Sequence, residues 1–153
     1  MNSRRLFIRA TRPFLKLYWF VFRPRTSGVK CLIECNGRVL MIRNTYGHRK
    51  WTFPGGGLER GEEPEAAARR EAREEVGTYP PAVAYLGHYF NTREYKRDTV
   101  HCFYGRVASE VFAVDPIEIA EAAWFSLDAL PQSLAKGAAE ALALYHKKIS
   151  NPS

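Results

Sequence analysis

Residues 56–78 read GGLERGEEPEAAARREAREEVGT, and three of their glutamates, Glu71, Glu74 and Glu75, fall within one turn of a predicted helix. At about 100° per residue, Glu74 and Glu75 lie on either side of Glu71, so the three carboxylates share one face. Like charges at this spacing repel each other by a few tenths of a kcal/mol per pair. A cation on this face would relieve the repulsion, and Mg²⁺ prefers a few carboxylates together with water and phosphate oxygens.

The neighbouring residues set the limits of this helix. Pro64 suits a first helical turn, where its missing N–H is no loss, and Gly77 suits the left-handed position just past a helix end. The pattern therefore predicts a helix over Pro64–Val76, with the triple-glycine loop at residues 55–57 leading into it. Taken alone, the charge run is also typical of a solvated surface helix whose glutamates pair with neighbouring arginines.

The complete spacing is G-x5-E-x7-R-E-x2-E-E-x-G, and it resembles the signature box of the Nudix hydrolases, enzymes that cleave nucleoside diphosphates linked to another group. The matching residues are Gly56, Glu62, Arg70, Glu71, Glu74, Glu75 and Gly77. Ala72 and Thr78 stand where the family usually has bulky aliphatic residues, a departure that concerns local packing and not chemistry. The resemblance is strongest over residues 28–131. It implies an α+β fold, an α/β/α sandwich with a mixed sheet between helices.

The resemblance also implies how the box residues act. The three helix glutamates would bind Mg²⁺, which Mn²⁺ can replace, together with the backbone carbonyl of Gly55. Glu62 would support these ligands from outside the metal's coordination shell, and Arg70 would hold a carboxylate in place through a bidentate pair. The bound metal would neutralise the diphosphate and lower the pKa of the attacking water.

A further carboxylate is expected from the loop before the last strand. Glu118 lies six residues before Trp124, which resembles the spacing in some family members, and it would bind metal or serve as the general base. Glu121 is a second candidate and Asp115 a weaker one. Each of these residues is equally typical of a solvated loop acid.

Basic and aromatic residues near the glycine loop are candidates for substrate contacts. Arg43, Arg49 and Lys50 flank the entry to this loop and can meet phosphates, although basic side chains at strand ends are more often simply solvated. Trp51 or Tyr46 could stack on a base, but Trp51 in a short strand is more typical of a core residue.

Length and composition indicate one globular domain. A chain of 153 residues with 46% hydrophobic residues is long enough for a buried core and excludes a disordered protein. Its three cysteines, Cys31, Cys35 and Cys102, show no C-x2-C spacing. We therefore expect them to be buried thiols of a reducing, cytoplasmic protein.

The net charge of +7 is concentrated at the N-terminal end. Residues 1–33 carry eight basic side chains and no acidic one, whereas the rest of the chain carries 15 basic and 16 acidic ones. We expect residues 1–27 to form a basic, aromatic segment and residues 28–153 the Nudix domain. The segment is interpreted as a helix docked on the domain or on a second subunit of a homodimer. Contact with RNA or a membrane surface through residues 1–25, or a targeting signal, are the alternatives.

The rest of the chain predicts short strands around the central helix. The pair Asn36-Gly37 is typical of a two-residue hairpin turn, residues 23–28 of a linker, and residues 93–98 of a charged turn. The predicted strands cover residues 29–35, 38–43, 50–53, 83–92, 99–108 and 123–126, and a closing helix covers about 133–148.

Together these features predict a Mg²⁺-dependent hydrolase of the pyrophosphate linkage in a nucleoside diphosphate derivative. A nucleotide sugar or ADP-ribose, a (d)NTP and a dinucleoside polyphosphate all stay open as the small-molecule nucleotide substrate. Two alternatives are removal of pyrophosphate from RNA 5′ ends, prompted by the basic N-terminal segment, and a non-catalytic nucleotide-sensing module on the same fold. A pure binder has little need of three crowded carboxylates, which argues against the second alternative.

Overall fold

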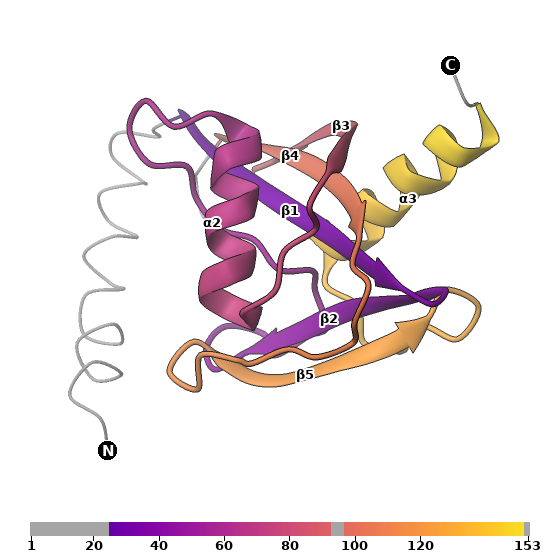
Figure 1. Ribbon diagram of the computed structural model, residues 1–153. Coiled ribbons are helices and arrows are strands. Elements are labelled where there is room, and N and C mark those ends of the chain that lie inside the picture. Colours follow the sequence, from indigo (N-terminus) through magenta and orange to yellow (C-terminus); the bar gives the residue numbers. More distant parts are fainter. Residues whose placement is uncertain (1–24, 93–96, 152–153) are drawn as a thin grey trace.

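The structure is a computed structural model that describes residues 25–92 and 97–151 of the chain (Figure 1). The predictions for the N-terminal segment up to residue 24, and for residues 93–96 of the charged turn, lie outside the described residues. Among the described residues, no helix is long and apolar enough to cross a membrane.

Five strands form one mixed sheet in the order β3-β4-β1-β2-β5. Strand β1 runs parallel to β4, and the other neighbouring pairs are antiparallel. The elements are β1 (Arg25–Cys35), β2 (Arg38–Asn44), α2 (Pro64–Val76), β3 (Val83–Asn91), β4 (Arg97–Arg106), β5 (Ile119–Ser126) and α3 (Lys136–Ser150). The predicted mixed sheet between helices is confirmed.

The two helices bury small side chains against separate halves of the core (Figure 1). Successive residues of β1 point to opposite faces of the sheet, so Cys31 packs with α2 and Leu32 packs with α3. The buried residues of the helices include Ala67, Ala68 and Ala72 of α2, and Ala138, Ala141 and Leu142 of α3. Ala72 is fully buried. The small residue in the box therefore fills a core position where α2 meets the sheet.

The glycine loop fills a gap between β1 and β2. These strands pair only beside their hairpin turn, where Asn36 and Gly37 have φ angles of 50° and 75°, as the predicted turn requires. Farther along, residues 51–57 lie between them. Ile42 of β2 exchanges backbone hydrogen bonds with Thr52, and β1 donates N–H groups to the loop carbonyls.

Several predicted boundaries are wrong. Residues 25–28 belong to β1 and not to a linker, because they pair with β4 along the parallel ladder. Strand β5 begins at Ile119, since residues 119–122 pair with the far end of β2. The strand predicted at 50–53 is reduced to bridges at Trp51 and Thr52. In contrast, α2 has the predicted limits, with Gly77 as a left-handed cap at φ 65°.

Candidate active site

The glycine loop lies close against β1 at Gly55 and against α2 at Gly56. A Cβ atom on Gly55 would lie 2.0 Å from the carbonyl oxygen of Val29, and one on Gly56 would lie 2.6 Å from the carboxylate of Glu71. The N–H of Gly55 donates to Glu75 Oε2 at 2.8 Å. The loop backbone therefore lies directly against two of the helix glutamates.

Arg70 connects α2 to the loop. Its guanidinium donates to both carboxylate oxygens of Glu62 at 2.9 Å, to Glu71 Oε1 at 2.8 Å and to the carbonyl of Gly57 at 3.0 Å. The bidentate pair is thus made with Glu62, and Glu71 receives one further hydrogen bond. Arg70, together with the N–H of Glu59, lowers the pKa of Glu62 to about 2.

Glu75 and Glu71 are the less accessible carboxylates of the helix. Burial raises the pKa of Glu75 to about 7, although Lys30 and the Gly55 N–H oppose the shift. Burial also raises the pKa of Glu71, against the effect of Arg70. The charge of Glu118 pushes both pKa values further up. The carboxylates of Glu71, Glu75 and Glu118 therefore repel one another, and the nearby cations only partly compensate this repulsion. Such an arrangement is expected of residues that bind a divalent metal.

Glu74 has a different environment from its two neighbours. Its side chain is 61% exposed and approaches Arg70 at 3.5 Å. In the described part of the chain, no three acidic, histidine or cysteine side chains lie close enough together to hold a metal ion. The oxygen donors of the three glutamates and the Gly55 carbonyl suit Mg²⁺ in kind. Metal binding here would require side chains to move, and the exposed Glu74 is the one that can move most easily.

The three acids before and in β5 have separate environments. Glu118 acts on the helix glutamates, and its backbone is fixed by a hydrogen bond from the N–H of Thr45 to its carbonyl. Glu121 lies in β5, not in a loop, and accepts a hydrogen bond from Arg43 at 2.9 Å. Asp115 accepts the N–H of Ile117 at 2.8 Å within its turn. Of these three acids, Glu118 is therefore the one whose charge acts on the helix glutamates.

The three basic residues predicted to contact substrate have partners other than the helix glutamates or are exposed. Arg43 bonds Glu121 and the carbonyl of Arg49, and its guanidinium lies 5.1 Å from the centre of the Trp51 ring. Arg49 and Lys50 are exposed. No hydrogen bond or ion pair within the described residues joins these three basic residues to the helix glutamates. Trp51 is buried and packs edge-on against Phe125, as expected of a core residue.

Lys30 is a candidate functional residue that the sequence analysis missed. It lies in β1, and its Nζ donates to the carbonyl of Phe53 at 3.0 Å, immediately before the glycine loop. Burial lowers the pKa of Lys30, while Glu75 and Glu71 act in the opposite direction. A lysine between the buried apolar residues Val29 and Cys31 is the sequence signal that could have indicated it.

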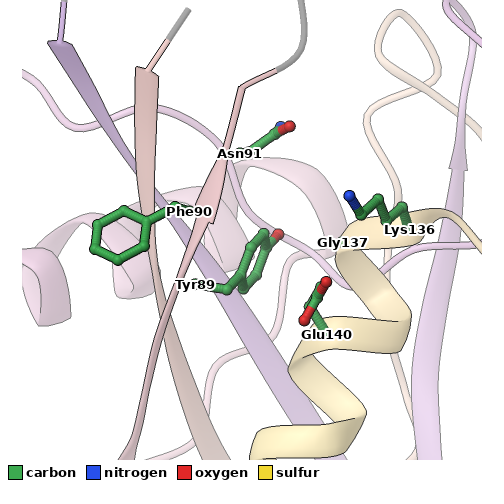
Figure 2. A pocket seen from close by; sticks show the side chains of 6 residues that line it. All are labelled: Tyr89, Phe90, Asn91, Lys136, Gly137 and Glu140. Carbon is green, nitrogen blue, oxygen red and sulfur yellow. The ribbon is translucent and has the colours of Figure 1, made fainter.

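A cleft of about 630 Å³ begins at Lys30 and the glycine loop. Its walls come from β1, from loop residues 56–60 and from the ends of β3 and β4 that adjoin residues 93–96. Asn91, Asp98 and Tyr89 line it on the side of β3 and β4. The Tyr89 ring extends from β3 toward the first turn of α3, where a Cβ on Gly137 would lie 2.5 Å from its hydroxyl (Figure 2). Clefts of this size typically hold small molecules.

Solved structures share this architecture. A MutT NUDIX hydrolase from Burkholderia pseudomallei superposes with a TM-score of 0.71 at 25% identity, covering 79% of this chain and 98% of that chain. The NUDIX domain of Shewanella oneidensis NrtR, solved with ADP ribose, has a TM-score of 0.69 at 15% identity, covering 84% of this chain and 91% of that chain.

Sequence comparison gives the same family. An RNA pyrophosphohydrolase from Acinetobacter baylyi is 47% identical over 65 residues, which are 42% of this chain and 37% of that relative. The chain thus spans roughly two-fifths of the length of the curated relatives it matches. The family model of the NUDIX domain matches residues 23–145, most of the chain. The chain therefore belongs to the Nudix family of hydrolases, which confirms the family, the fold class and the enzyme family expected from the sequence.

Proposed function

We propose that this protein hydrolyses the pyrophosphate linkage of a nucleoside diphosphate derivative, with Mg²⁺ as its cofactor. The observation that carries the proposal is the contact between the glycine loop and the helix glutamates. Gly55 donates its N–H to Glu75. The Glu71 carboxylate occupies the space that a side chain at position 56 would need. Bound through Glu71, Glu74, Glu75 and the Gly55 carbonyl, the metal would neutralise the diphosphate and activate water.

The other residues have supporting roles in this proposal. Arg70 holds Glu71 against the loop, and Glu62 holds Arg70 in position. Glu118, whose charge acts on both buried glutamates, accepts the proton of the attacking water or adds a metal ligand. Arg49 and Lys50, both exposed, stay candidates for phosphate contacts at the rim, whereas Arg43 is already engaged by Glu121.

The favoured substrate is a small nucleotide such as ADP-ribose or a nucleotide sugar. A cleft of small-molecule size adjoins the glycine loop, and one structural neighbour was solved with ADP ribose. Hydrolysis of RNA 5′ ends is the second candidate, because the relatives that match nearly half of the chain are RNA pyrophosphohydrolases and because residues 1–33 are strongly basic. The free, buried cysteines suit a cytoplasmic protein. A homodimer, and membrane or RNA contact through residues 1–25, stay predictions.

The test is a panel of substrates offered to the purified full-length chain with Mg²⁺. ADP-ribose, a nucleotide sugar, NTPs, a dinucleoside polyphosphate and a 5′-triphosphorylated RNA oligomer are incubated separately, and phosphate release is measured with a coupled phosphatase. We expect hydrolysis of at least one compound, lost in EDTA and restored by Mg²⁺ or Mn²⁺. Hydrolysis that persists in EDTA, or none on any compound, would contradict the proposal.

Substitution of a helix glutamate tests the metal site itself. Glu74→Gln or Glu75→Gln keeps the shape of the side chain and removes one negative oxygen ligand. We expect turnover to fall by about a hundredfold or more, since losses of metal ligands and their supports usually cost about 10–100-fold or more. Folding should hold, because the substitution removes a like charge from the helix face. A glutamine variant with full Mg²⁺-dependent activity would refute the assignment.

A further inference from the structure

We propose that Lys30 binds the phosphate chain of the substrate, so that the diphosphate lies between Lys30 and the glutamates of α2 while its attached group occupies the cleft over β1, β4 and β3. This inference rests on the proposed function and extends it to a binding residue and to the size of the substrate.

The ammonium group of Lys30 has hydrogen-bonding capacity that the described residues leave unused. An ammonium carries three N–H donors, and within the described residues its acceptor is the Phe53 carbonyl, 3.0 Å away. The side chain forms no ion pair in that part of the chain, although Glu75 and Glu71 are near enough to act on its charge. Two donors are therefore left for an oxygen-rich ligand.

The partly buried position of Lys30 disfavours its charge unless an anion lies beside it. Burial is the largest influence on Lys30 and disfavours its charged form. An ammonium that is partly withdrawn from water is unfavourable unless an anion compensates its charge. An anion that enters the cleft would offset this cost, so the charge contributes most when a phosphate is bound.

The position of Lys30 joins the glutamate site to the cleft. Lys30, Gly56 and Gly57 all line the cleft. The Glu71 carboxylate lies against Gly56, where a Cβ atom would meet it at 2.6 Å. The glycine loop is therefore a shared wall, with the helix glutamates against it at one place and Lys30 beside it at another. A diphosphate that follows this wall meets the glutamates first and Lys30 next.

The rest of the cleft limits what the diphosphate can carry. Beyond Lys30 the cleft reaches Asn91 and Asp98 and is bordered by Tyr89. The Tyr89 ring lies against the first turn of α3 at Gly137 (Figure 2). Its volume of about 630 Å³ suits one nucleoside or sugar group together with phosphates. Backbone and polar side chains supply hydrogen-bonding groups along it. The geometry points to a mononucleotide derivative, with the RNA 5′ end as the alternative that the experiment tests.

The experiment uses the full-length chain and the non-hydrolysable diphosphate α,β-methylene-ADP, titrated by calorimetry in Mg²⁺ and separately in EDTA. A hydrogen bond to a charged group contributes about 1.5–3 kcal/mol, so we expect Lys30→Met to weaken binding about 10- to 100-fold. The loss should appear with and without metal, because Lys30 is not a metal ligand. Lys30→Arg should recover part of the affinity, and adenosine, which has no phosphate, should bind both proteins equally.

A matched control and a folding measurement accompany the titration. Lys147→Met removes an exposed lysine from α3 that lies outside the cleft, and its affinity should equal that of the wild type. Thermal unfolding should show that Lys30→Met still folds cooperatively, so that its loss of affinity reflects binding. Binding by Lys30→Met within twofold of the wild type would overturn the inference.

The outcomes separate this inference from the proposed function. Wild-type protein that hydrolyses nucleotides but binds α,β-methylene-ADP independently of Lys30 would refute only the role of Lys30. Wild-type protein that binds the diphosphate through Lys30 but shows no Mg²⁺-dependent hydrolysis would refute only catalysis. Tighter binding of a 5′-triphosphorylated RNA oligomer than of α,β-methylene-ADP, unchanged in Lys30→Met, would refute the assignment of the cleft to a mononucleotide derivative.

Discussion

The adjacent loop residues Gly56 and Gly57 have different surroundings, and this difference predicts different effects of an alanine at each position. A Cβ on Gly56 would lie 2.6 Å from Glu71 Oε1. Because the obstructing atoms are the end of a flexible side chain, Gly56→Ala should fold normally but displace the Glu71 carboxylate. We expect Mg²⁺-dependent turnover to fall about 10- to 100-fold, the usual effect of disturbing a metal ligand, with little change in thermal stability.

Gly57→Ala is the matched control. A Cβ on Gly57 would meet nothing within 4 Å. This variant should keep wild-type turnover. If the two alanine variants lost activity equally, the effect would come from loop flexibility and not from the position of Glu71.

Glu75 should make the stability of the metal-free protein depend on pH. Its folded-state pKa of about 7 lies above the ordinary value of 4.5, so the folded protein holds a proton that the unfolded chain releases. The stabilising effect of this proton is complete below about pH 4.5 and is lost as the pH rises through about 7. At about 1.4 kcal/mol per pH unit, the loss amounts to at most roughly 3–4 kcal/mol.

Denaturant unfolding in EDTA at pH 5 and pH 8 measures this effect. Glu75→Gln removes the titrating group, so the difference between wild type and variant isolates Glu75 from other ionisable residues. We expect the wild type to lose more stability than the variant between the two pH values. Equal pH dependence of both proteins would show that Glu75 ionises as freely in the folded state as in the unfolded chain.

At the scale of elements, α2 and the loop before it form a unit that local sequence signals specify. Pro64 begins the helix and Gly77 ends it, and both signals lie within the box itself. Lys30 could not be placed in the same way. Its contact with Phe53 joins residues 23 positions apart. The contact depends on the separation of β1 from β2, which no local pattern shows.

Arg70 is the residue that should couple the two parts of this unit. It bonds Glu62, Glu71 and the Gly57 carbonyl at once. Lysine keeps the charge but lacks the planar fork, so Arg70→Lys cannot satisfy all three partners. We expect a 10- to 100-fold fall in kcat, approximately, and weaker Mg²⁺ affinity, measured by metal titration of activity.

Arg69→Lys, one position away, tests whether any arginine of α2 would have the same effect. Arg69 pairs with Glu65, whose side chain is half exposed, and lies 4.4 Å from the centre of the Tyr79 ring. Its replacement should leave kcat and metal affinity near the wild-type values. A similar loss in both variants would mean that Arg70 contributes only to the stability of the helix.

At the scale of the whole molecule, the sequence predicted the layers but not the surface where substrate would lie. The cleft combines Lys30 of β1, Gly56 of the loop, and Tyr89 and Asp98 of β3 and β4, which are far apart in the chain. Parallel pairing of β1 with β4 brings them together. That pairing also explains why residues 25–28 are a strand, since they pair residue by residue with 97–100 of β4. Such long-range pairings leave no trace in the local pattern.

Removing residues 1–24 should leave the chemistry of the domain intact. The truncation stops before β1, which begins at Arg25, and the box lies wholly within the part that remains. The deleted segment holds six basic residues and no acid, so the net charge falls from +7 to +1 and the isoelectric point falls with it. We expect turnover of small nucleotides near the wild-type value and lower solubility, because a net charge close to zero favours association.

Removing residues 1–28 is the control. It deletes the first β1 residues that pair with β4, and it should destabilise the sheet in thermal unfolding. If the shorter truncation folds but no longer hydrolyses nucleotides, the N-terminal segment helps to build the substrate site. If the shorter truncation loses activity on triphosphorylated RNA but keeps activity on small nucleotides, the result supports RNA 5′ ends as the substrate.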